Sequence, residues 1–251
     1  MVRVFHRIVR ELFVLLSLLP GCTYLYPTKT PIKTLWYVQS ENTHARLLIF
    51  LPGRYSSAAS FQTEKFIEIA RDAGLDMDMV AVDAHLGYYY RRTLLARLSE
   101  DVIGPAKKRG YSRFWVLGIS LGGLGGLWFD TSVPGELEGL ILLSPYLGDS
   151  EIVAEVAASG GIRAWQAPHV GKESIQRGIW KMLKNYEDLQ RSRGRLFLGY
   201  GLSDAFAESN GMLAELVPAG QVFTVEGGHD WPTWRTLWEI MLKCPELQRD
   251  G

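Results

Sequence analysis

The chain has 251 residues, of which 47% are hydrophobic and 12% aromatic. That length and composition suffice for one sizeable hydrophobic core in a single domain. The 27 basic residues equal the 27 acidic ones, so nothing in the bulk charge indicates a nucleic-acid partner.

The first 21 residues have the pattern of a secretory signal peptide. A short apolar segment, 12–19, follows three arginines, Arg3, Arg7 and Arg10. It is much shorter than the ~20 residues that a membrane-spanning helix needs. The four residues at 19–22, Leu-Pro-Gly-Cys, resemble a bacterial lipobox, in which cleavage occurs before a cysteine that then carries lipid. A buried N-terminal helix is the alternative, although burial of three arginines would be costly.

We therefore expect residues 1–21 to be removed and Cys22 to carry lipid. Residues 22–34, with their two prolines, would then tether the domain to a membrane of the bacterial cell envelope, on the periplasmic side. Lipidation leaves Cys244 as a single thiol, whereas a Cys22–Cys244 disulfide is the competing interpretation for an oxidising compartment. Cleavage removes three arginines and Glu11 from 27 basic and 27 acidic residues, leaving 24 and 26. Lipid would thus hold the protein without help from a basic patch.

From residue 35 onward, apolar runs rich in β-formers alternate with helical patterns. Strands are predicted at Leu35–Gln39, Leu47–Leu51, Met79–Asp83, Phe114–Leu117, Leu140–Leu143, Leu196–Gly199 and Val222–Val225. Most runs after residue 47 are continuous rather than alternating, which is typical of strands covered on both faces in a parallel sheet. The pattern predicts a doubly wound, mostly parallel α/β fold over residues 35–251, with ligands at the carboxyl ends of the strands.

Three of the intervening helices are clear from their periodicity. One begins with Ser60 as its cap and ends at Gly74, and a second is expected to kink before Pro105. The last begins near Pro232 and places five apolar residues on one stripe: Trp234, Leu237, Trp238, Met241 and Leu242.

Residues 146–194 separate two predicted strands by more than a single crossover helix requires. They predict a short helix at Glu151–Ala158 and a longer one that directs Ile175, Ile179, Leu183 and Tyr186 inward. This stretch is either a cap over the carboxyl edge of the sheet or a pair of packing helices.

The pentapeptide Gly118-Ile119-Ser120-Leu121-Gly122 lies between a predicted strand and the small-residue run 123–126. Gly-x-Ser-x-Gly in a strand–turn–helix setting is typical of a nucleophile elbow, whose tight turn lifts the serine hydroxyl above the strand end. Only glycine-sized neighbours fit beside so sharp a turn. Ser120 is therefore the predicted nucleophile, and it needs a base, an acid and oxyanion donors.

Loops after the last two predicted strands supply the base and the acid. His229, in Glu-Gly-Gly-His-Asp at 226–230, is the predicted base, and His85 is its rival. Asp204 is the predicted acid, since neighbouring parallel strands lie about 5 Å apart and their loops can meet. Asp149 is the alternative acid, whereas Asp230 is expected to cap the final helix.

The oxyanion hole needs two backbone donors. We predict the N–H of Leu121, the residue after the nucleophile, and the N–H of Arg54 in the loop Leu51-Pro52-Gly53-Arg54. A plain strand-terminating Pro-Gly turn is the alternative for that loop. No clustered His, Cys or Asp spacing indicates a metal, and the expected chemistry needs no cofactor.

Together these motifs resemble the α/β-hydrolase superfamily, and within it the small esterase- and lipase-like members. The resemblance covers residues 46–243 and rests on Leu-Pro-Gly at 51–53, Gly-Ile-Ser-Leu-Gly-Gly at 118–123, Asp204 and Gly-Gly-His at 227–229. Pro52 departs from the family pattern, because many members have a histidine before the oxyanion glycine.

The resemblance implies hydrolysis of a small carboxylic ester or other acyl compound through an acyl-enzyme on Ser120. Two alternatives stay open. The same fold and triad could serve an acyltransferase, thioesterase or peptidase, or the chain could be a catalytically silent binding lipoprotein.

Overall fold

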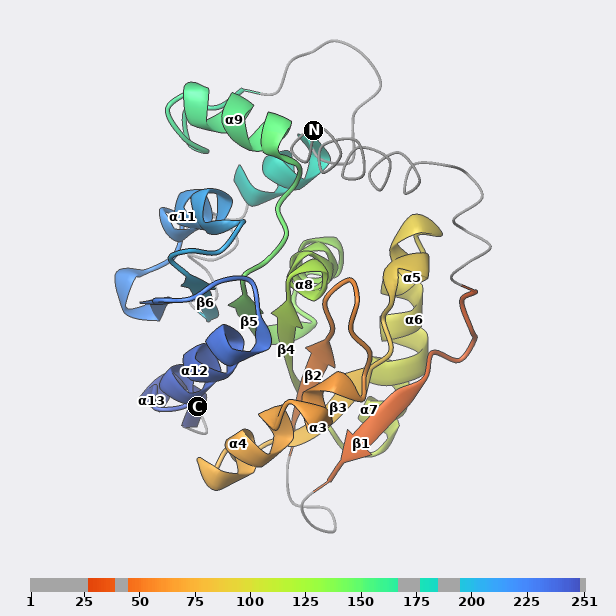
Figure 1. The fold of residues 1–251 in the computed structure, drawn as a ribbon. Coiled ribbons are helices and arrows are strands. Elements are labelled where there is room, and N and C mark those ends of the chain that lie inside the picture. Colours follow the sequence, from red (N-terminus) through yellow and green to blue (C-terminus); the bar gives the residue numbers. More distant parts are fainter. Residues whose placement is uncertain (1–26, 39–44, 167–176, 185–194, 249–251) are drawn as a thin grey trace, which may run out of the picture.

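A seven-stranded sheet in the order β1-β3-β2-β4-β5-β6-β7 organises the chain (Figure 1). The computed structural model describes residues 27–38, 45–166, 177–184 and 195–248. The strands are β1 (Thr34–Tyr37), β2 (Arg46–Leu51), β3 (Asp78–Val82), β4 (Arg113–Ile119), β5 (Leu137–Leu143), β6 (Leu196–Gly201) and β7 (Val222–Val225). Among the strands of the described residues, β1 and β3 pair antiparallel and the other pairs are parallel. The predicted α/β architecture and its seven strands are confirmed.

The sheet separates two hydrophobic clusters because alternate residues of each central strand point to opposite faces. In β2, Leu47, Ile49 and Leu51 belong to one cluster, while Leu48 and Phe50 belong to the other. Both sets are buried, which explains why the strand reads as an unbroken apolar run rather than an alternating one.

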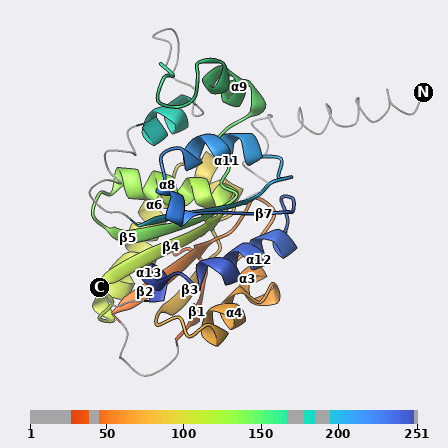
Figure 2. The ribbon, with the colours of Figure 1, turned by 90° about the vertical axis from the view of Figure 1, so that its left-hand side faces the viewer.

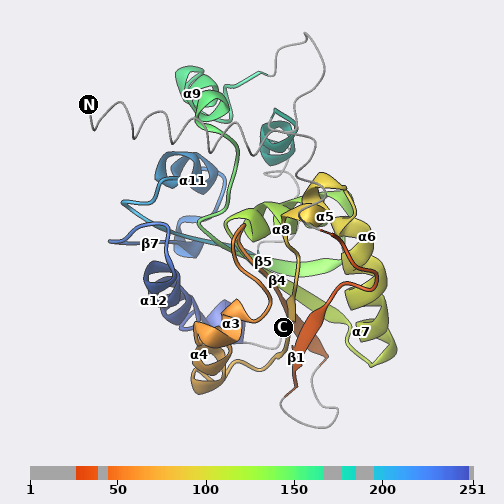
Figure 3. The same ribbon diagram turned by 45° about the vertical axis from the view of Figure 1, so that its right-hand side comes forward.

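Helices cover both faces of the sheet (Figures 2 and 3). The first face carries α5 (Leu86–Tyr90), α6 (Leu94–Arg97), the π-helical turn η1 (Leu98–Ile103), α7 (Gly104–Lys108), α8 (Leu121–Ser132) and α11 (Ala207–Ala214). The second carries α3 (Ser60–Thr63), α4 (Phe66–Asp72), α12 (Trp231–Met241) and α13 (Pro245–Gln248). A 3-10 turn, η2 (Ala219–Gln221), leads into β7.

The final helix follows its prediction closely. All five residues of the expected apolar stripe are buried in the second cluster. Asp230 caps the helix by accepting a hydrogen bond from the Thr233 amide at 2.9 Å, as predicted. The cap and the stripe together fix where the chain turns back onto the sheet after β7.

The helix predicted from Ser60 to Gly74 is wrong in one respect, because the structure contains two helices there. Lys65 adopts a left-handed conformation, with φ of 64°, and separates α3 from α4. Ala59 is the residue that precedes α3, and the Ser60 hydroxyl instead accepts from the amide of Ser57. The break changes the direction of the chain, and in α4 the side chains of Phe66, Ile67 and Ala70 are buried. A periodic pattern alone does not reveal such a break.

The segment after β5 lies beyond the carboxyl ends of the central strands in Figure 1. It contains α9 (Ser150–Ala158), close to its predicted bounds, and a helix over 177–184 in which Ile179 and Leu183 are buried as predicted. The other two inward residues expected there, Ile175 and Tyr186, lie outside the described residues. Whether this segment acts as a cap stays a prediction.

No helix in the described ranges is long and apolar enough to cross a bilayer. The predicted signal peptide, Cys22 and most of the predicted tether lie outside those ranges.

Candidate active site

Ser120 occupies a strained turn between β4 and α8. Its backbone has φ of 52° and ψ of −113°, a region that a residue with a Cβ seldom adopts. The turn is held from both sides, since the Ser120 amide donates to the Leu143 carbonyl at 2.9 Å and its carbonyl accepts from Tyr146 at 2.9 Å. The surrounding structure thus imposes the strain that presents the hydroxyl at the carboxyl end of β4.

Two glycines make this turn possible because backbone passes directly beside them. A Cβ on Gly118 would lie 2.3 Å from the Gly122 carbonyl oxygen. A Cβ on Gly122 would lie 2.0 Å from the carbonyl oxygen of Leu51, at the end of β2. Both contacts are to backbone and leave no room for a side chain. The Gly-x-Ser-x-Gly spacing therefore has the steric basis that the sequence predicted.

The predicted nucleophile, base and acid come together at this edge of the sheet. His229 Nε2 lies 3.0 Å from the Ser120 hydroxyl oxygen. His229 Nδ1 lies 3.0 and 2.9 Å from the two carboxylate oxygens of Asp204. With Asp204 accepting at Nδ1–H, Nε2 is left free to accept the serine proton.

The loops that carry Asp204 and His229 are joined to each other. The Ser203 amide donates to the Gly227 carbonyl at 2.9 Å. A Cβ on Gly201 would lie 2.3 Å from that same carbonyl oxygen, and Gly227 itself has φ of 148°. Glycines therefore allow the β6 and β7 loops to approach backbone to backbone, which brings the Asp204 carboxylate to the His229 imidazole.

Asp204 is buried and yet kept charged. Its carboxylate side chain is 0% exposed, and burial alone would raise its pKa. Hydrogen bonds from His229, from the Phe206 amide at 2.8 Å and from the Ser144 hydroxyl outweigh burial and lower the pKa below its ordinary value. The site therefore contains a fixed negative charge behind the imidazole over the whole neutral pH range.

Aromatic rings enclose the His229 imidazole on two sides. The Phe206 ring centroid lies 4.7 Å away and the Trp234 centroid 4.9 Å away, both edge-on. The side chain of His229 is nevertheless 27% exposed, so one side of the ring stays open toward a substrate. Sequence reasoning assigned Trp234 only to the core and did not single out Phe206, Ser144 or Tyr146.

The predicted oxyanion loop lies against the elbow. A Cβ on Gly53 would be 3.5 Å from the Ser120 Cβ, which is ordinary contact and places the following residue, Arg54, beside the nucleophile. Within the described ranges, the amides of Arg54 and Leu121 donate no hydrogen bond. Leu121 also begins α8, whose N-terminus favours negative charge.

The alternatives to the predicted acid and base lie in other contacts. Asp149 accepts a hydrogen bond from the Tyr146 hydroxyl at 2.6 Å, whereas Asp204 is the carboxylate beside His229. His85 caps α5 by accepting from the Gly87 amide at 3.2 Å and packs on the Tyr88 ring. Burial lowers the pKa of His85 against the opposing effect of Asp83.

The loops that follow β2 and β5 carry aromatic and basic side chains. Tyr55 is 83% exposed, and the Arg54 guanidinium lies 5.2 Å from the centroid of its ring. Tyr146 packs edge-on against Phe206 with centroids 5.5 Å apart. Burial and the hydrogen bond to Asp149 raise the pKa of Tyr146, so it stays a neutral hydrogen-bonding group.

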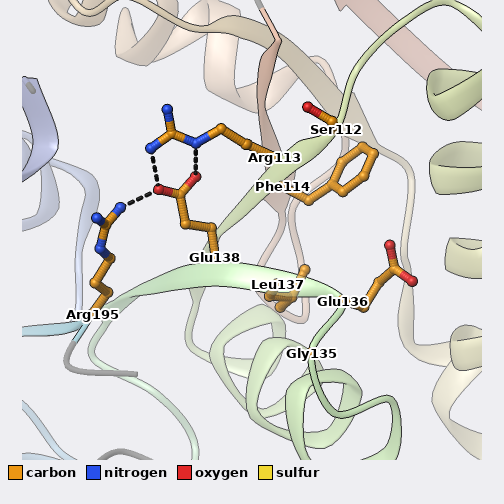
Figure 4. A pocket seen from close by; sticks show the side chains of 8 residues that line it. All are labelled: Ser112, Arg113, Phe114, Gly135, Glu136, Leu137, Glu138 and Arg195. Atoms are coloured by element: carbon orange, nitrogen blue, oxygen red, sulfur yellow. Dashed lines mark hydrogen bonds and ion pairs between the residues drawn. The ribbon is translucent and has the colours of Figure 1, made fainter. Parts of the chain in front are cut away.

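No group of three or more His, Cys, Asp or Glu side chains that could hold a metal occurs in the described part of the chain. A hollow lies at the opposite edge of the sheet, where the parallel strands begin (Figure 4). There Glu138 pairs with both Arg113 and Arg195, so one carboxylate partly offsets two guanidinium charges. The hollow is lined by Ser112, Arg113, Phe114, Gly135, Glu136, Leu137, Glu138 and Arg195.

Comparisons with known proteins show the fold. No protein-family model matches the sequence, and no curated protein matches it. A solved structure of a ferulic acid esterase superimposes with a TM-score of 0.59 at 17% identity, covering 84% of this chain and 87% of that one. Est1E from Butyrivibrio proteoclasticus gives 0.55 at 16% identity, with 84% and 90% covered. S-formylglutathione hydrolase (FrmB) from Staphylococcus aureus gives 0.54 at 14% identity, with 84% of each chain covered.

The chain thus has the α/β-hydrolase fold, as the resemblance of its motifs implied. At these identities the similarity establishes the architecture, and the chemistry must be argued from the site itself.

The contact between Gly122 and Leu51 gives a test of the elbow. We expect Gly122→Ala to lower the free energy of unfolding by about 3 kcal/mol, because the new Cβ overlaps backbone that cannot move independently. Denaturant titration followed by circular dichroism measures this change. Gly220→Ala is the control, since nothing lies within 4 Å of its added Cβ, and its stability should change by less than about 0.5 kcal/mol. Equal midpoints for Gly122→Ala and the wild type would contradict the steric argument.

Proposed function

We propose that this protein is a serine hydrolase that cleaves carboxylic esters through an acyl-enzyme on Ser120. The observation that carries the proposal is the continuous hydrogen-bonded series from the Ser120 hydroxyl through both nitrogens of His229 to the buried Asp204 carboxylate. A serine hydroxyl becomes nucleophilic when a base accepts its proton and a carboxylate stabilises the resulting imidazolium.

The first half-reaction forms the acyl-enzyme. Ser120 Oγ attacks the ester carbonyl carbon while His229 Nε2 takes the hydroxyl proton. The carbonyl oxygen becomes an oxyanion, which the backbone N–H groups of Arg54 and Leu121 stabilise together with the N-terminus of α8. His229 then gives its proton to the alkoxide oxygen as the C–O bond breaks, and the alcohol leaves.

The second half-reaction restores the enzyme. His229 takes a proton from water, whose oxygen attacks the acyl carbon on Ser120. The oxyanion forms again at the same two amides, and its collapse releases the carboxylic acid and returns the proton to Ser120. Asp204 stays ionised throughout, in keeping with the hydrogen bonds that lower its pKa.

The names of similar structures favour hydrolysis at an acyl carbon over a catalytically silent binding protein. Two of the three structures reported above are named as an esterase or a hydrolase: a ferulic acid esterase and an S-formylglutathione hydrolase. A further one, at 14% identity and a TM-score of 0.52, is a monoacylglycerol lipase from Paleococcus ferrophilus. Tyr55 and Tyr146, on the loops that follow β2 and β5, are compatible with an acyl or alcohol group of apolar character.

The proposal includes a cellular location. Cys22, after the basic and apolar segment at the N-terminus, would carry lipid and hold the domain at a bacterial membrane on the periplasmic side. Seven residues after Cys22, the Lys29 amide donates a hydrogen bond to the Tyr88 hydroxyl of the domain at 3.0 Å. Only a short stretch of chain would therefore separate lipid and enzyme.

Removal of the nucleophile tests the reaction. We expect Ser120→Ala to lower kcat by about 10⁶-fold on p-nitrophenyl esters, because no other group can form the acyl-enzyme. Initial rates with detergent-extracted full-length protein and esters of increasing chain length measure this loss. Labelling of the wild type by a fluorophosphonate probe, and its absence in the variant, separates a hydrolase from a silent binding protein. Equal rates for the two proteins would exclude the esterase.

The choice of acid is tested by a matched pair. We expect Asp204→Asn to lower kcat by about 10⁴-fold, because an amide cannot hold His229 in the required tautomer. Asp149→Asn should change kcat by less than about 10-fold, since Asp149 bonds to Tyr146 and not to the imidazole. Steady-state rates of both variants at one pH show which carboxylate is the acid. A larger loss in Asp149→Asn than in Asp204→Asn would assign that role to Asp149.

The anchor is tested by fractionation. We expect Cys22→Ser to move the protein from the membrane fraction to the soluble fraction, because it removes the thiol that would carry the lipid. Ultracentrifugation and immunoblotting of cells that express the full chain measure the distribution. Cys244→Ser is the matched control and should stay with the membranes. Unchanged fractionation of Cys22→Ser would contradict lipidation.

A further inference from the structure

Trp234 is a buried tryptophan whose ring packs against the imidazole of His229. The two ring centroids lie 4.9 Å apart, and the ring planes are at 89° to each other. Trp234 is 6% exposed, whereas the side chain of His229 is 27% exposed. The apolar stripe of the final helix explains why Trp234 is buried, but it does not explain the contact with the imidazole.

A hydrogen bond holds the Trp234 indole in one orientation. Its Nε1–H donates to the Ser144 hydroxyl oxygen at 3.1 Å, in a buried position. Ser144 is 0% exposed, and its own amide donates to the Gly199 carbonyl of β6 at 2.8 Å, so the acceptor is attached to the sheet. An indole that rotated away would leave a buried N–H without an acceptor, which is costly. The ring is therefore oriented by the sheet as well as by its packing.

Further aromatic rings support the indole. The Trp231 ring packs edge-on against it, with centroids 5.2 Å apart. Trp231 in turn packs on Phe61 of α3 at 5.9 Å and on Phe66 of α4 at 5.5 Å. Close-packed side chains have little room to move, so these rings make Trp234 a rigid surface beside the imidazole.

The same short stretch of chain carries the imidazole and the indole. Trp234 follows His229 by five residues, and its amide donates to the Asp230 carbonyl at 3.1 Å. Asp230 also caps α12 by accepting from the Thr233 amide at 2.9 Å. The capped first turn of α12 thus fixes the position of Trp234 relative to the loop that carries His229.

The contact with Asp204 alone leaves the direction of the imidazole open. The carboxylate contacts the ring at Nδ1, whereas Nε2 must point at the Ser120 hydroxyl oxygen, 3.0 Å away. The second side-chain torsion of histidine is broad, so a ring held at one nitrogen can turn about that contact. Phe206 packs on the imidazole at 4.7 Å, but its side chain has no polar group that could hold it in place. Trp234 packs at a similar distance and has such a group.

We propose that Trp234 is a positioning residue for His229: its fixed indole keeps Nε2 of the imidazole directed at the Ser120 hydroxyl. The inference rests on the proposed function, because it assigns how the base of that site is oriented. Trp234 acts through His229 rather than on the reacting atoms. A misplacement of about 1 Å at a reacting group can cost about 100-fold in rate, so the orientation of the imidazole has a measurable effect.

Trp238 provides a matched control on the same helix. It is 0% exposed, and its indole Nε1–H donates to the Phe66 carbonyl at 3.1 Å, so it also combines a buried ring with a hydrogen bond. Its ring stacks on Phe66, with centroids 6.3 Å apart. Phenylalanine or leucine at either position removes the same groups from α12, but position 234 is the one beside the imidazole.

The two positions should differ in kcat. We expect Trp234→Phe to lower kcat on p-nitrophenyl esters by about 10-fold, because the smaller ring lacks the N–H that holds it. Trp234→Leu should lower kcat by about 100-fold, because the ring is lost. KM should change by less than about 2-fold in both variants, since the indole acts on proton transfer. Trp238→Phe and Trp238→Leu should keep the wild-type kcat and KM, even where denaturant titration shows an equal or larger loss of stability.

A spectroscopic measurement tests the orientation without any substrate. Proton NMR of protein labelled with ¹⁵N-histidine detects the Nδ1 proton between His229 and Asp204. This proton should exchange faster with water in both Trp234 variants, because a less confined imidazole breaks its bond to the carboxylate more often. In the Trp238 variants the exchange rate should equal that of the wild type.

Each outcome supports or overturns the inference. Wild-type kcat in the Trp234 variants would overturn it, and so would an equal loss of kcat in the Trp238 variants. If Trp234→Leu does not fold, Trp234→Phe decides by the same measurements. A wild type that reacts with neither esters nor a fluorophosphonate probe would refute the proposed function instead. The exchange rate of the Nδ1 proton then tests the positioning role, and an unchanged rate in Trp234→Phe would overturn it.

Discussion

The close contact between the first turn of α8 and the end of β2 is the constraint on which the site depends. A Cβ at position 122 would lie only 2.0 Å from the Leu51 carbonyl oxygen. The helix can therefore start at this point only because residue 122 is glycine. The same contact sets Ser120 beside the loop that begins at Pro52, so nucleophile and predicted oxyanion donors are positioned by one backbone approach. Packed backbone does not deform gradually, which makes this geometry rigid.

A second constraint joins Asp204 to His229. The loops after β6 and β7 meet through the Ser203–Gly227 hydrogen bond and the glycine at position 201, which brings the Asp204 carboxylate to the imidazole. Because these loops leave adjacent parallel strands, the sheet fixes their spacing before any side chain interacts.

The buried charge of Asp204 shows how packing and electrostatics oppose each other at the site. Burial disfavours the carboxylate, and it stays ionised because the hydrogen bonds it accepts outweigh that penalty. The two aromatic rings that pack against His229 cover two sides of the imidazole and leave part of it open, while the Asp204 side chain is fully buried. Such an environment keeps the interactions of the site strong, since water does not screen them.

The sequence by itself determined the strands, the elbow and the candidate base and acid. Strands buried on both faces need continuous apolar runs, and such runs are visible in the sequence. Local backbone contacts require glycine at Gly118 and Gly122, so the elbow is visible in the sequence as well. Tertiary structure alone decided the break at Lys65, the placement of Asp204 rather than Asp149 beside His229, and the packing of Phe206 and Trp234 against the imidazole. Those depend on which side chains from distant segments meet, and no local pattern encodes a contact made across 90 residues, such as that between Ser144 and Trp234.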